Sequence, residues 1–522
     1  MQKKLLAVAV LSAFSGVAAA QSANVTLYGT IQNELQFRSV TGSDDQAAPA
    51  AAVSATRSSF RTGASYTTTP TDYSSRLASQ SAGSNFGVRG TEDLGNGLSA
   101  FFQIELATTI GGPNALGSAA GGTAATYRNT GLGLRSNTWG SYMFGQWDVP
   151  FDTIGNNQIN GATSGPTTNV TYSLLGGNAA AAGSVSAQTF DGMCNSGNGT
   201  VTSTNVAGSA VPVLTGAVNA LTFQSAVTQC LNHGMNFSRR QSGQLQWWSP
   251  NWNGFEVRVG YVPTQFTSAQ NSSNTGAQSA TFNASGVAGA ANTNASLRPS
   301  QWDLAASYTN GGLKVVGAYQ AKKDYVAQAV RTWYGTLGAT AGAASSQMIT
   351  IGTTGNNVAA GVVGISQDIS GSKDRGWRLG ASYRFGMGLS LGLLYENLKW
   401  NMNYNSAGAG TAANVTELKN NAWRLQANYA TGNHTFTGEY ARKSDTTGST
   451  DNAAIAFNGG QSGAKEWILG YAYSFSKRTS MLGYYMSIVN DTNAAYGPTF
   501  GGIAGSRGGD HKYYGVGLRH AF

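Results

Sequence analysis

The feature that most constrains this chain is a two-residue alternation of apolar and polar side chains. In its first long instance, Val25, Leu27 and Ile31 share one parity, while Thr26 and Gln32 share the other. Side chains two residues apart lie on one face of a β-strand, so this period predicts strands with an apolar and a polar face. The alternation returns at 255–261, 302–308, 377–385, 423–429 and 467–475. The chain is therefore expected to be all-β.

A β-sandwich would alternate as well, but two further features favour a membrane barrel. The apolar faces begin and end in Trp, Tyr or Phe, as the aromatic girdles at a membrane interface require. Short turns such as 93–97, 137–140 and 310–312 are also interleaved with long segments rich in Ala, Gly, Ser, Thr and Asn. Short periplasmic turns and long external loops are typical of outer-membrane barrels.

Division of the chain at these turns predicts a closed antiparallel transmembrane barrel of sixteen strands. Closure gives every strand a partner, so that no unpaired sheet edge meets lipid. The predicted strands are 25–40, 75–91, 98–107, 127–136, 140–147, 239–249, 255–263, 300–309, 313–322, 375–385, 389–400, 418–430, 434–443, 465–475, 480–489 and 511–522.

Composition excludes the competing classes of protein. Charged residues make up only 11% of the chain, too few to cover the surface of a typical soluble domain. A hydrophobic content of 41% argues against disorder. After the N-terminus no run of 18 apolar residues occurs, so a transmembrane helix is not expected.

The N-terminus has the three parts of a secretory signal peptide. Lys3 and Lys4 form its positive region, an apolar stretch follows, and Ala18 to Ala20 supply a cleavage site. We therefore expect residues 1–20 to be a signal peptide and 21–522 to be the barrel domain. Without the two lysines the basic count falls from 32 to 30 against 23 acidic residues, a net charge of +7. No Lys/Arg-rich run accompanies this excess, so nucleic acid is not an expected partner.

Several short motifs resemble the general porins of β-proteobacteria, and together they extend over nearly the whole mature chain. They are Val25-Thr-Leu-Tyr-Gly29, Arg89-Gly-Thr-Glu-Asp-Leu-Gly95, Arg239-Arg240, Gln246-Trp-Trp-Ser-Pro-Asn-Trp-Asn-Gly254 and Tyr514-Gly-Val-Gly-Leu-Arg-His-Ala-Phe522. The resemblance implies a sixteen-stranded homotrimer whose third external loop folds inward and narrows the pore. Phe522 also resembles the C-terminal signal read by the outer-membrane assembly machinery.

The third external loop is expected to run over 148–238, a length that is usually functional or disordered. It opens with Asp148-Val-Pro-Phe-Asp152, which resembles the start of the family's loop. Asp148, Asp152 and also Asp191 are candidate acidic lining residues. Cys194 and Cys230 lie in the same loop and would meet an oxidising compartment, so a disulfide is favoured over two free thiols. With only His233 nearby, a zinc site is not expected.

Opposite this loop the resemblance implies a basic cluster on the barrel wall. Strand parity places arginines on the inner face, namely Arg38, Arg89, Arg240, Arg258 and Arg135. Two positions depart from the family pattern: Asn85 stands where the family often has arginine, and Gly131 stands at a position that is sometimes basic. We still expect an anion preference, because charge acts most strongly where a pore is narrow.

These patterns predict a porin for passive diffusion of ions and small hydrophilic solutes, with no enzymatic activity, cofactor or metal. Its expected partners are outer-membrane lipid and lipopolysaccharide. A substrate-specific channel is the nearest alternative, although Trp248 and Tyr28 are the only inward aromatic residues that parity identifies. A barrel enzyme such as a phospholipase would need a Ser and His constellation that four scattered histidines do not suggest. An additional role as an adhesin or phage receptor stays open.

Overall fold

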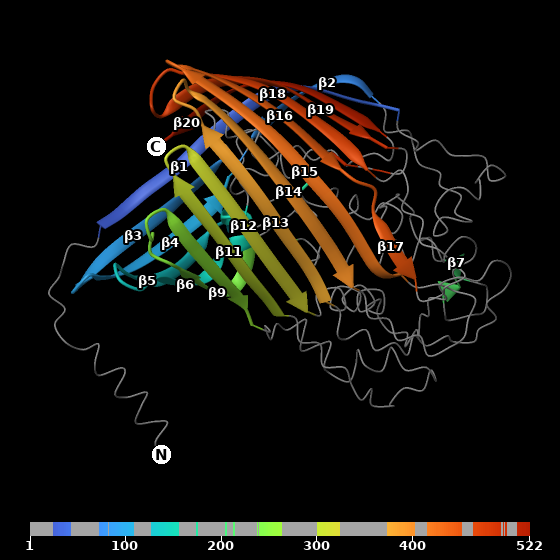
Figure 1. The fold of residues 1–522 in the computed structure, drawn as a ribbon. Helices are drawn as coiled ribbons and strands as arrows, with labels where there is room; N and C mark the ends of the chain where they lie inside the picture. The colour runs from blue at the N-terminus through green and yellow to red at the C-terminus, as the bar shows by residue number, and fades with distance from the viewer. Residues whose placement is uncertain are drawn as a thin grey trace, which may run out of the picture.

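The protein is described from a computed structural model of the chain (Figure 1). The predicted signal peptide, Asp191, Cys194 and Cys230 lie outside the residues that the structure describes. These residues are 24–42, 73–81, 83–108, 127–155, 174–175, 204–205, 212–213, 237, 240–263, 300–323, 373–401, 415–450, 463–491, 494, 496–497 and 509–522.

The strands form one closed antiparallel barrel (Figure 1). The last strand pairs with the first, from Thr30 opposite Ala521 to Thr41 opposite Asp510. The barrel strands are β1 Asn24–Thr41, β2 Tyr73–Ser81, β3 Asn85–Gly95, β4 Leu98–Ala107, β5 Thr130–Ser136, β6 Gly140–Asp148, β9 Arg240–Trp248, β10 Phe255–Val262, β11 Ser300–Asn310, β12 Leu313–Lys323, β13 Lys373–Arg384, β14 Leu389–Asn401, β15 Val415–Thr431, β16 His434–Lys443, β17 Thr447–Thr450, β18 Ala464–Ser474, β19 Thr479–Asn490 and β20 Asp510–Ala521.

Two short elements of other kinds follow β6. They are a helical turn, α2 Pro150–Thr153, and a separate pair of two-residue strands, β7 Thr204–Asn205 and β8 Pro212–Val213. Within the described residues, no helix combines the length and apolar character needed to cross a membrane.

The sixteen-strand prediction is confirmed, although the sheet contains 18 strand segments. β2 and β3 both pair with the same edge of β1, and β16 and β17 both pair with the same edge of β15. Each pair of segments is therefore one wall strand with an interruption, which reduces 18 segments to sixteen strands. The predicted strand 75–91 is in this way divided at Gly83 and Ser84.

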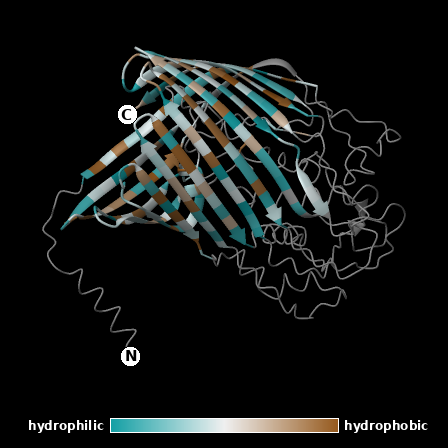
Figure 2. Ribbon diagram, viewed as in Figure 1, coloured by the Kyte–Doolittle hydropathy of each residue, from teal (hydrophilic) through white to brown (hydrophobic). Residues whose placement is uncertain are grey.

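The predicted two faces of each strand are present in the barrel. On β20, Tyr514, Val516 and Leu518 are 55, 61 and 58% exposed, whereas the preceding Tyr513 and the intervening Gly515 and Gly517 are buried. Figure 2 shows the resulting alternation of hydrophobic and hydrophilic residues along the strands. Exposed apolar side chains on strand after strand suit a wall that faces hydrocarbon, while the backbone polar groups pair between strands.

The short turns and the C-terminus lie at the same end of the barrel (Figure 1). Two of these turns use an Asn-Gly pair with positive φ, Asn96 at 53° before Gly97 at 74° and Asn253 at 51° before Gly254 at 92°. Such pairs suit tight hairpin turns, which explains why these turns could be read from the sequence.

Candidate functional site: the barrel lumen

The segment after β6 packs against the inside of the barrel wall. α2 contacts β10, β11 and β12. Gly260 makes room for it, because a Cβ at that position would lie 3.0 Å from Pro150 Cδ. Val149, Phe151 and Ile154 are all buried. The expectation that the third loop folds inward is therefore confirmed for its described beginning.

Arg378 on β13 holds the start of this loop to the wall. Its Nε donates to Glu396 Oε2 at 2.6 Å, and its Nη1 donates to the Phe151 carbonyl oxygen at 3.2 Å. Its Nη1 also lies 3.6 Å from Asp152 Oδ1, and its guanidinium carbon lies 4.3 Å from the centre of the Phe151 ring. Arg378 is 1% exposed and Glu396 is fully buried. Neither residue could be singled out from the sequence, because strand parity does not show which inward side chains a loop covers.

Two further points of the loop are held on the same side of the barrel. Lys443 Nζ donates to the Leu174 carbonyl oxygen at 3.0 Å. Gln320 Nε2 donates to the Phe237 carbonyl oxygen at 3.2 Å, and Lys322 Nζ lies 4.0 Å from the centre of the Phe237 ring. The loop is thus attached near its start, in its middle and at its end to strands between β10 and β16.

The predicted acidic residues Asp148 and Asp152 both pair with arginines. Asp148 Oδ1 lies 3.0 Å from Arg240 Nε, and Asn129 bonds to both partners. Asp152 contacts Arg378 instead. One predicted acidic residue and one predicted basic residue are therefore paired with each other at the start of the loop.

The structure gives the remaining predicted arginines separate partners. Arg38 is 4% exposed and its Nε donates to Gln36 Oε1 at 2.8 Å. Arg89 is exposed, and its guanidinium carbon lies 4.9 Å from the Tyr28 ring centre. The guanidinium carbon of Arg258 lies 4.8 Å from the Trp248 ring centre. Arg38 lies near the loop end of its strand, whereas the other two lie toward the short turns.

The two departures from the family pattern have local consequences. Asn85 donates through Nδ2 to the Gly83 carbonyl oxygen at 3.1 Å, beside the interruption between β2 and β3. Gly131 is closely approached by the neighbouring strand β6. A Cβ at this position would lie 2.7 Å from Phe144 O and 3.1 Å from Met143 Sδ. Neither position supplies a positive charge to the lumen.

A buried polar network on β1 was missed in the sequence. Glu34 accepts hydrogen bonds from Gln32 at 2.5 Å, from Gln36 at 2.9 Å and from the Tyr484 hydroxyl at 2.8 Å. Gln32, Glu34, Gln36 and Arg38 follow one another with period two. That repeat is the signal that could have indicated a continuous polar ridge along one strand.

The C-terminal residue completes the barrel seam. The Phe522 backbone N–H donates to Gly29 O at 3.0 Å and its carbonyl accepts from Gly29 N at 3.2 Å. The Phe522 ring also covers Gly29, where a Cβ would lie 2.5 Å from Phe522 Cζ. The ring is 40% exposed on the outside of the barrel.

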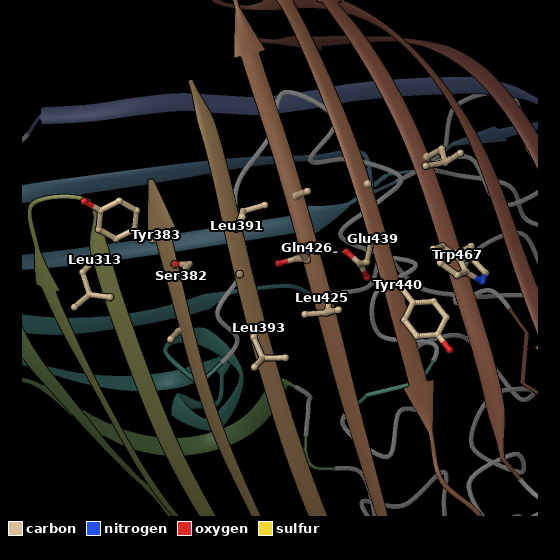
Figure 3. A pocket seen from close by; sticks show the side chains of 15 residues that line it. Leu313, Ser382, Tyr383, Leu391, Leu393, Leu425, Gln426, Glu439, Tyr440 and Trp467 are labelled. Atoms are coloured by element: carbon tan, nitrogen blue, oxygen red, sulfur yellow. Dashed lines mark hydrogen bonds between the residues drawn. The ribbon is translucent and has the colours of Figure 1, made fainter. Parts of the chain in front are cut away.

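The outer wall carries an apolar groove of about 630 Å³ across β12 to β18 (Figure 3). Leu393, Leu425 and Tyr440 are among the outward side chains that border it, while Gln426 and Glu439 hydrogen-bond at 2.7 Å on the lumen side of the same strands. The groove therefore belongs to the lipid-facing surface and not to the path of a solute.

Comparison with known proteins gives one family across most of the chain. The family described as Gram-negative porin matches residues 7–350 and 347–493. An outer membrane porin protein of Bordetella pertussis (strain Tohama I) is 36% identical over 146 residues, 28% of this chain. The matched part spans 33% of the length of that curated relative.

Several solved structures with a similar fold are distant in sequence. The anion-selective porin from Comamonas acidovorans is 19% identical with a TM-score of 0.49, over 96% of this chain and 100% of that one. The trimer form of OmpT from Vibrio cholerae is 11% identical with a TM-score of 0.49, over the same shares. The channel DcaP of Acinetobacter baumannii is 10% identical with a TM-score of 0.46, over 98% of this chain and 100% of that one.

Proposed function

We propose that this chain, which belongs to the Gram-negative porin family, forms a water-filled channel for passive diffusion of ions and small hydrophilic solutes. The protein is a closed barrel of the outer membrane. The observation that carries the proposal is its polar inner face, on which a loop is held against one side of the wall. Such a wall encloses a path that water and small polar solutes can share.

We further propose that the channel prefers anions. Basic side chains outnumber acidic ones on the accessible inner face toward the short turns. The basic residues are Arg89, Arg135, Arg258, Lys314, Arg384 and Arg519, and the acidic residues of the same parity and region are Asp93 and Glu256. Fixed positive charge along a confined path attracts anions and repels cations.

Recordings from the purified protein in planar bilayers with a salt gradient test both proposals. We expect a steady chloride-selective current. Replacing Arg89 and Arg384 with Glu should move the reversal potential toward the cation side. Lys465→Glu reverses the sign of one charge on the outward face of β18 and should leave the potential near its original value. A cation-selective wild type would overturn the anion preference, and an absence of conductance would overturn the channel.

A channel, and not a barrel hydrolase, also fits the environment of the described histidines. His434 Nδ1 lies 2.9 Å from the Tyr471 hydroxyl and His520 Nδ1 lies 2.9 Å from Thr479 Oγ1, both on exposed outer positions. His511 is fully buried and lies 3.2 Å from the Tyr513 hydroxyl. None of these contacts aligns a serine, a histidine and an acid, as nucleophilic hydrolysis requires.

We also propose a homotrimer in the outer membrane, surrounded by lipid and lipopolysaccharide and inserted by the assembly machinery. The family resemblance and the apolar outer face support this arrangement. Mass photometry or native mass spectrometry in detergent should give three copies per particle. A uniform monomer under conditions that keep the barrel folded would contradict it.

A further inference from the structure

A row of two stacked aromatic side chains with an arginine at each end lies on the inner wall toward the short turns. The guanidinium carbon of Arg135 lies 5.0 Å from the Phe101 ring centre. Phe101 is stacked with Trp248 at 6.1 Å and an interplanar angle of 27°. The guanidinium carbon of Arg258 lies 4.8 Å from the Trp248 ring centre. We call Arg135, Phe101, Trp248 and Arg258 the arginine–aromatic ladder.

The ladder is built by adjacent strands and needs a glycine. Trp248 on β9 is opposite Ser141 on β6 and Arg258 on β10, and Phe101 on β4 is opposite Gly133 on β5. A Cβ on Gly133 would lie 2.6 Å from Phe101 Cζ. The absence of a side chain at Gly133 therefore lets the Phe101 ring lie along the wall. Only two of the members, Arg258 and Trp248, are in direct register, so the rest of the ladder depends on ring orientation.

The ladder is accessible from the lumen, unlike the wall under the third loop. Arg135 is exposed and the other three members are partly exposed. Trp147 packs beside Trp248 with ring centres 5.5 Å apart and extends the aromatic surface. Buried Arg378 shows the contrast, since its donors are directed to Glu396 and to the loop.

Both arginines keep hydrogen-bond donors for a solute. Arg135 Nε donates to Ser141 Oγ at 3.3 Å, which leaves its terminal nitrogens. Arg258 makes no hydrogen bond or ion pair within the described part of the chain. Glu256, two residues before Arg258 on the same face, accepts a hydrogen bond from Asn251 at 3.0 Å. A negatively charged solute would thus meet two guanidinium groups and one nearby carboxylate.

We infer that this ladder binds small aromatic carboxylates on their way through the channel, an inference that rests on the proposed function. A guanidinium group can stack on an aromatic ring with its plane and bind a carboxylate with its edge. An aliphatic carboxylate uses only the edge. A sugar needs free aromatic faces, which the two guanidinium groups here partly cover. A flat ring that carries a carboxylate uses both features of the site.

Channel block distinguishes these solutes directly. Benzoate and cyclohexanecarboxylate have the same charge and nearly the same size, but only benzoate has an aromatic ring. We expect benzoate to reduce the chloride current through the full-length protein in a planar bilayer. Its half-blocking concentration should be about five times lower than that of cyclohexanecarboxylate. Equal block by the two acids, or stronger block by glucose, would overturn the inference.

Variants assign the preference to the ladder. Trp248→Leu should abolish the difference between the two acids, and Arg258→Gln should weaken block by both. Arg384→Gln is the matched control, because Arg384 is also an exposed arginine of inward parity near a short turn, with β11 and β12 separating its strand from β10. It should keep the preference for benzoate. If Trp248→Leu keeps that preference as well, the ladder is not the site.

A second ladder variant guards against a loss of selective block that is caused only by misfolding. The chloride current of the wild-type protein separates a failure of the ladder from a failure of the channel. Phe101→Leu keeps both arginines and Trp248 but removes the ring that stacks on Trp248 and lies beside Arg135, so it should reduce the preference for benzoate. Circular dichroism verifies that every ladder variant forms β-sheet. Chloride current without selective block would contradict the ladder alone, whereas no current in the wild-type protein would contradict the channel itself.

Discussion

At the scale of single residues, burial decides what a lumen charge can do. Arg378 and Arg384 lie on the same face of β13, yet Arg378 is buried beneath the third loop and Arg384 is exposed near a short turn. Parity predicts the direction of both side chains. It does not predict which side chain is buried, because Arg378 is covered by a loop segment more than 200 positions away, as its contact with Phe151 shows. Strand parity likewise predicts that Arg38 faces the lumen but does not predict that it is buried there.

Arg378→Met should destabilise the barrel and loosen the loop. The substitution removes the donor to buried Glu396 and to Phe151 O, and breaking one side of a buried ion pair costs about 3–5 kcal/mol. We expect a lower melting temperature in detergent and noisier single-channel current. Arg384→Met, on the same strand, should change neither the melting temperature nor the noise. Wild-type values for Arg378→Met would contradict the role of this contact.

The Asp491 carboxyl, just after β19, should make stability depend on pH. Partial burial raises the pKa of Asp491 above its ordinary value, and nearby Asp445 raises it further. A raised pKa means that the folded state favours the protonated form. This stabilisation is complete below the unfolded pKa of about 3.9 and is lost as pH rises through the folded pKa. Asp491→Asn should therefore raise the melting temperature at pH 7 but not at pH 3. Glu92→Gln, which removes an exposed carboxylate, is measured beside it as the control.

At the scale of strands and loops, the sequence predicted the wall better than its lining. Period two and Asn-Gly turns are local signals, and they located all sixteen strands to within a few residues. The division between β2 and β3 was not expected. Across it the outward side chains change parity, from Leu77 on β2 to Phe86 and Val88 on β3. The pairing of Asp148 with Arg240 was not expected either. It follows from an irregular register between Gly145 and Trp147, which no local pattern announces.

Gly376 should control how the end of the third loop sits on the wall. A Cβ there would lie 2.7 Å from Phe237 Cδ1, and Phe237 also packs against Trp400 with ring centres 5.5 Å apart. Gly376→Val should displace Phe237, increase current noise and change the conductance. Gly438→Ala is the control, because a Cβ at Gly438 would meet no atom within 4 Å. An unchanged conductance with Gly376→Val would show that Phe237 does not hold the loop.

The predicted disulfide between Cys194 and Cys230 belongs to the same loop and stays a prediction from sequence. Mass spectrometry of non-reduced peptides should find the two cysteines linked. Two free thiols would contradict it.

At the scale of the whole molecule, the barrel is closed at a seam where its two ends meet. Phe522 pairs through its backbone with Gly29 and covers that glycine with its ring. The backbone bonds complete the cylinder, while the ring is the part that resembles an assembly signal. These two roles can be separated by experiment.

Phe522→Ala keeps the backbone bonds, whereas deletion of Phe522 removes them. If the ring is read during assembly, Phe522→Ala should lower the amount of folded barrel in cells but leave refolding into detergent unchanged. Deletion should impair both, because Gly29 then lacks its partners. Heat-modifiable mobility on gels measures the folded fraction in each case. Normal assembly of Phe522→Ala in cells would show that the ring is not the signal.

The attachment of the loop to one side of the lumen has a consequence for ionic strength. At physiological ionic strength dissolved ions screen exposed charges beyond about 8 Å, but they screen buried pairs much less. The Arg378 contacts are dry, whereas the ladder and the exposed arginines are bathed in the lumen solution. A change from low to high ionic strength should therefore change the ion selectivity of the channel while the shape of the pore stays the same. The same barrel can in this way act as a selective filter in dilute surroundings and as a plain molecular sieve in concentrated ones.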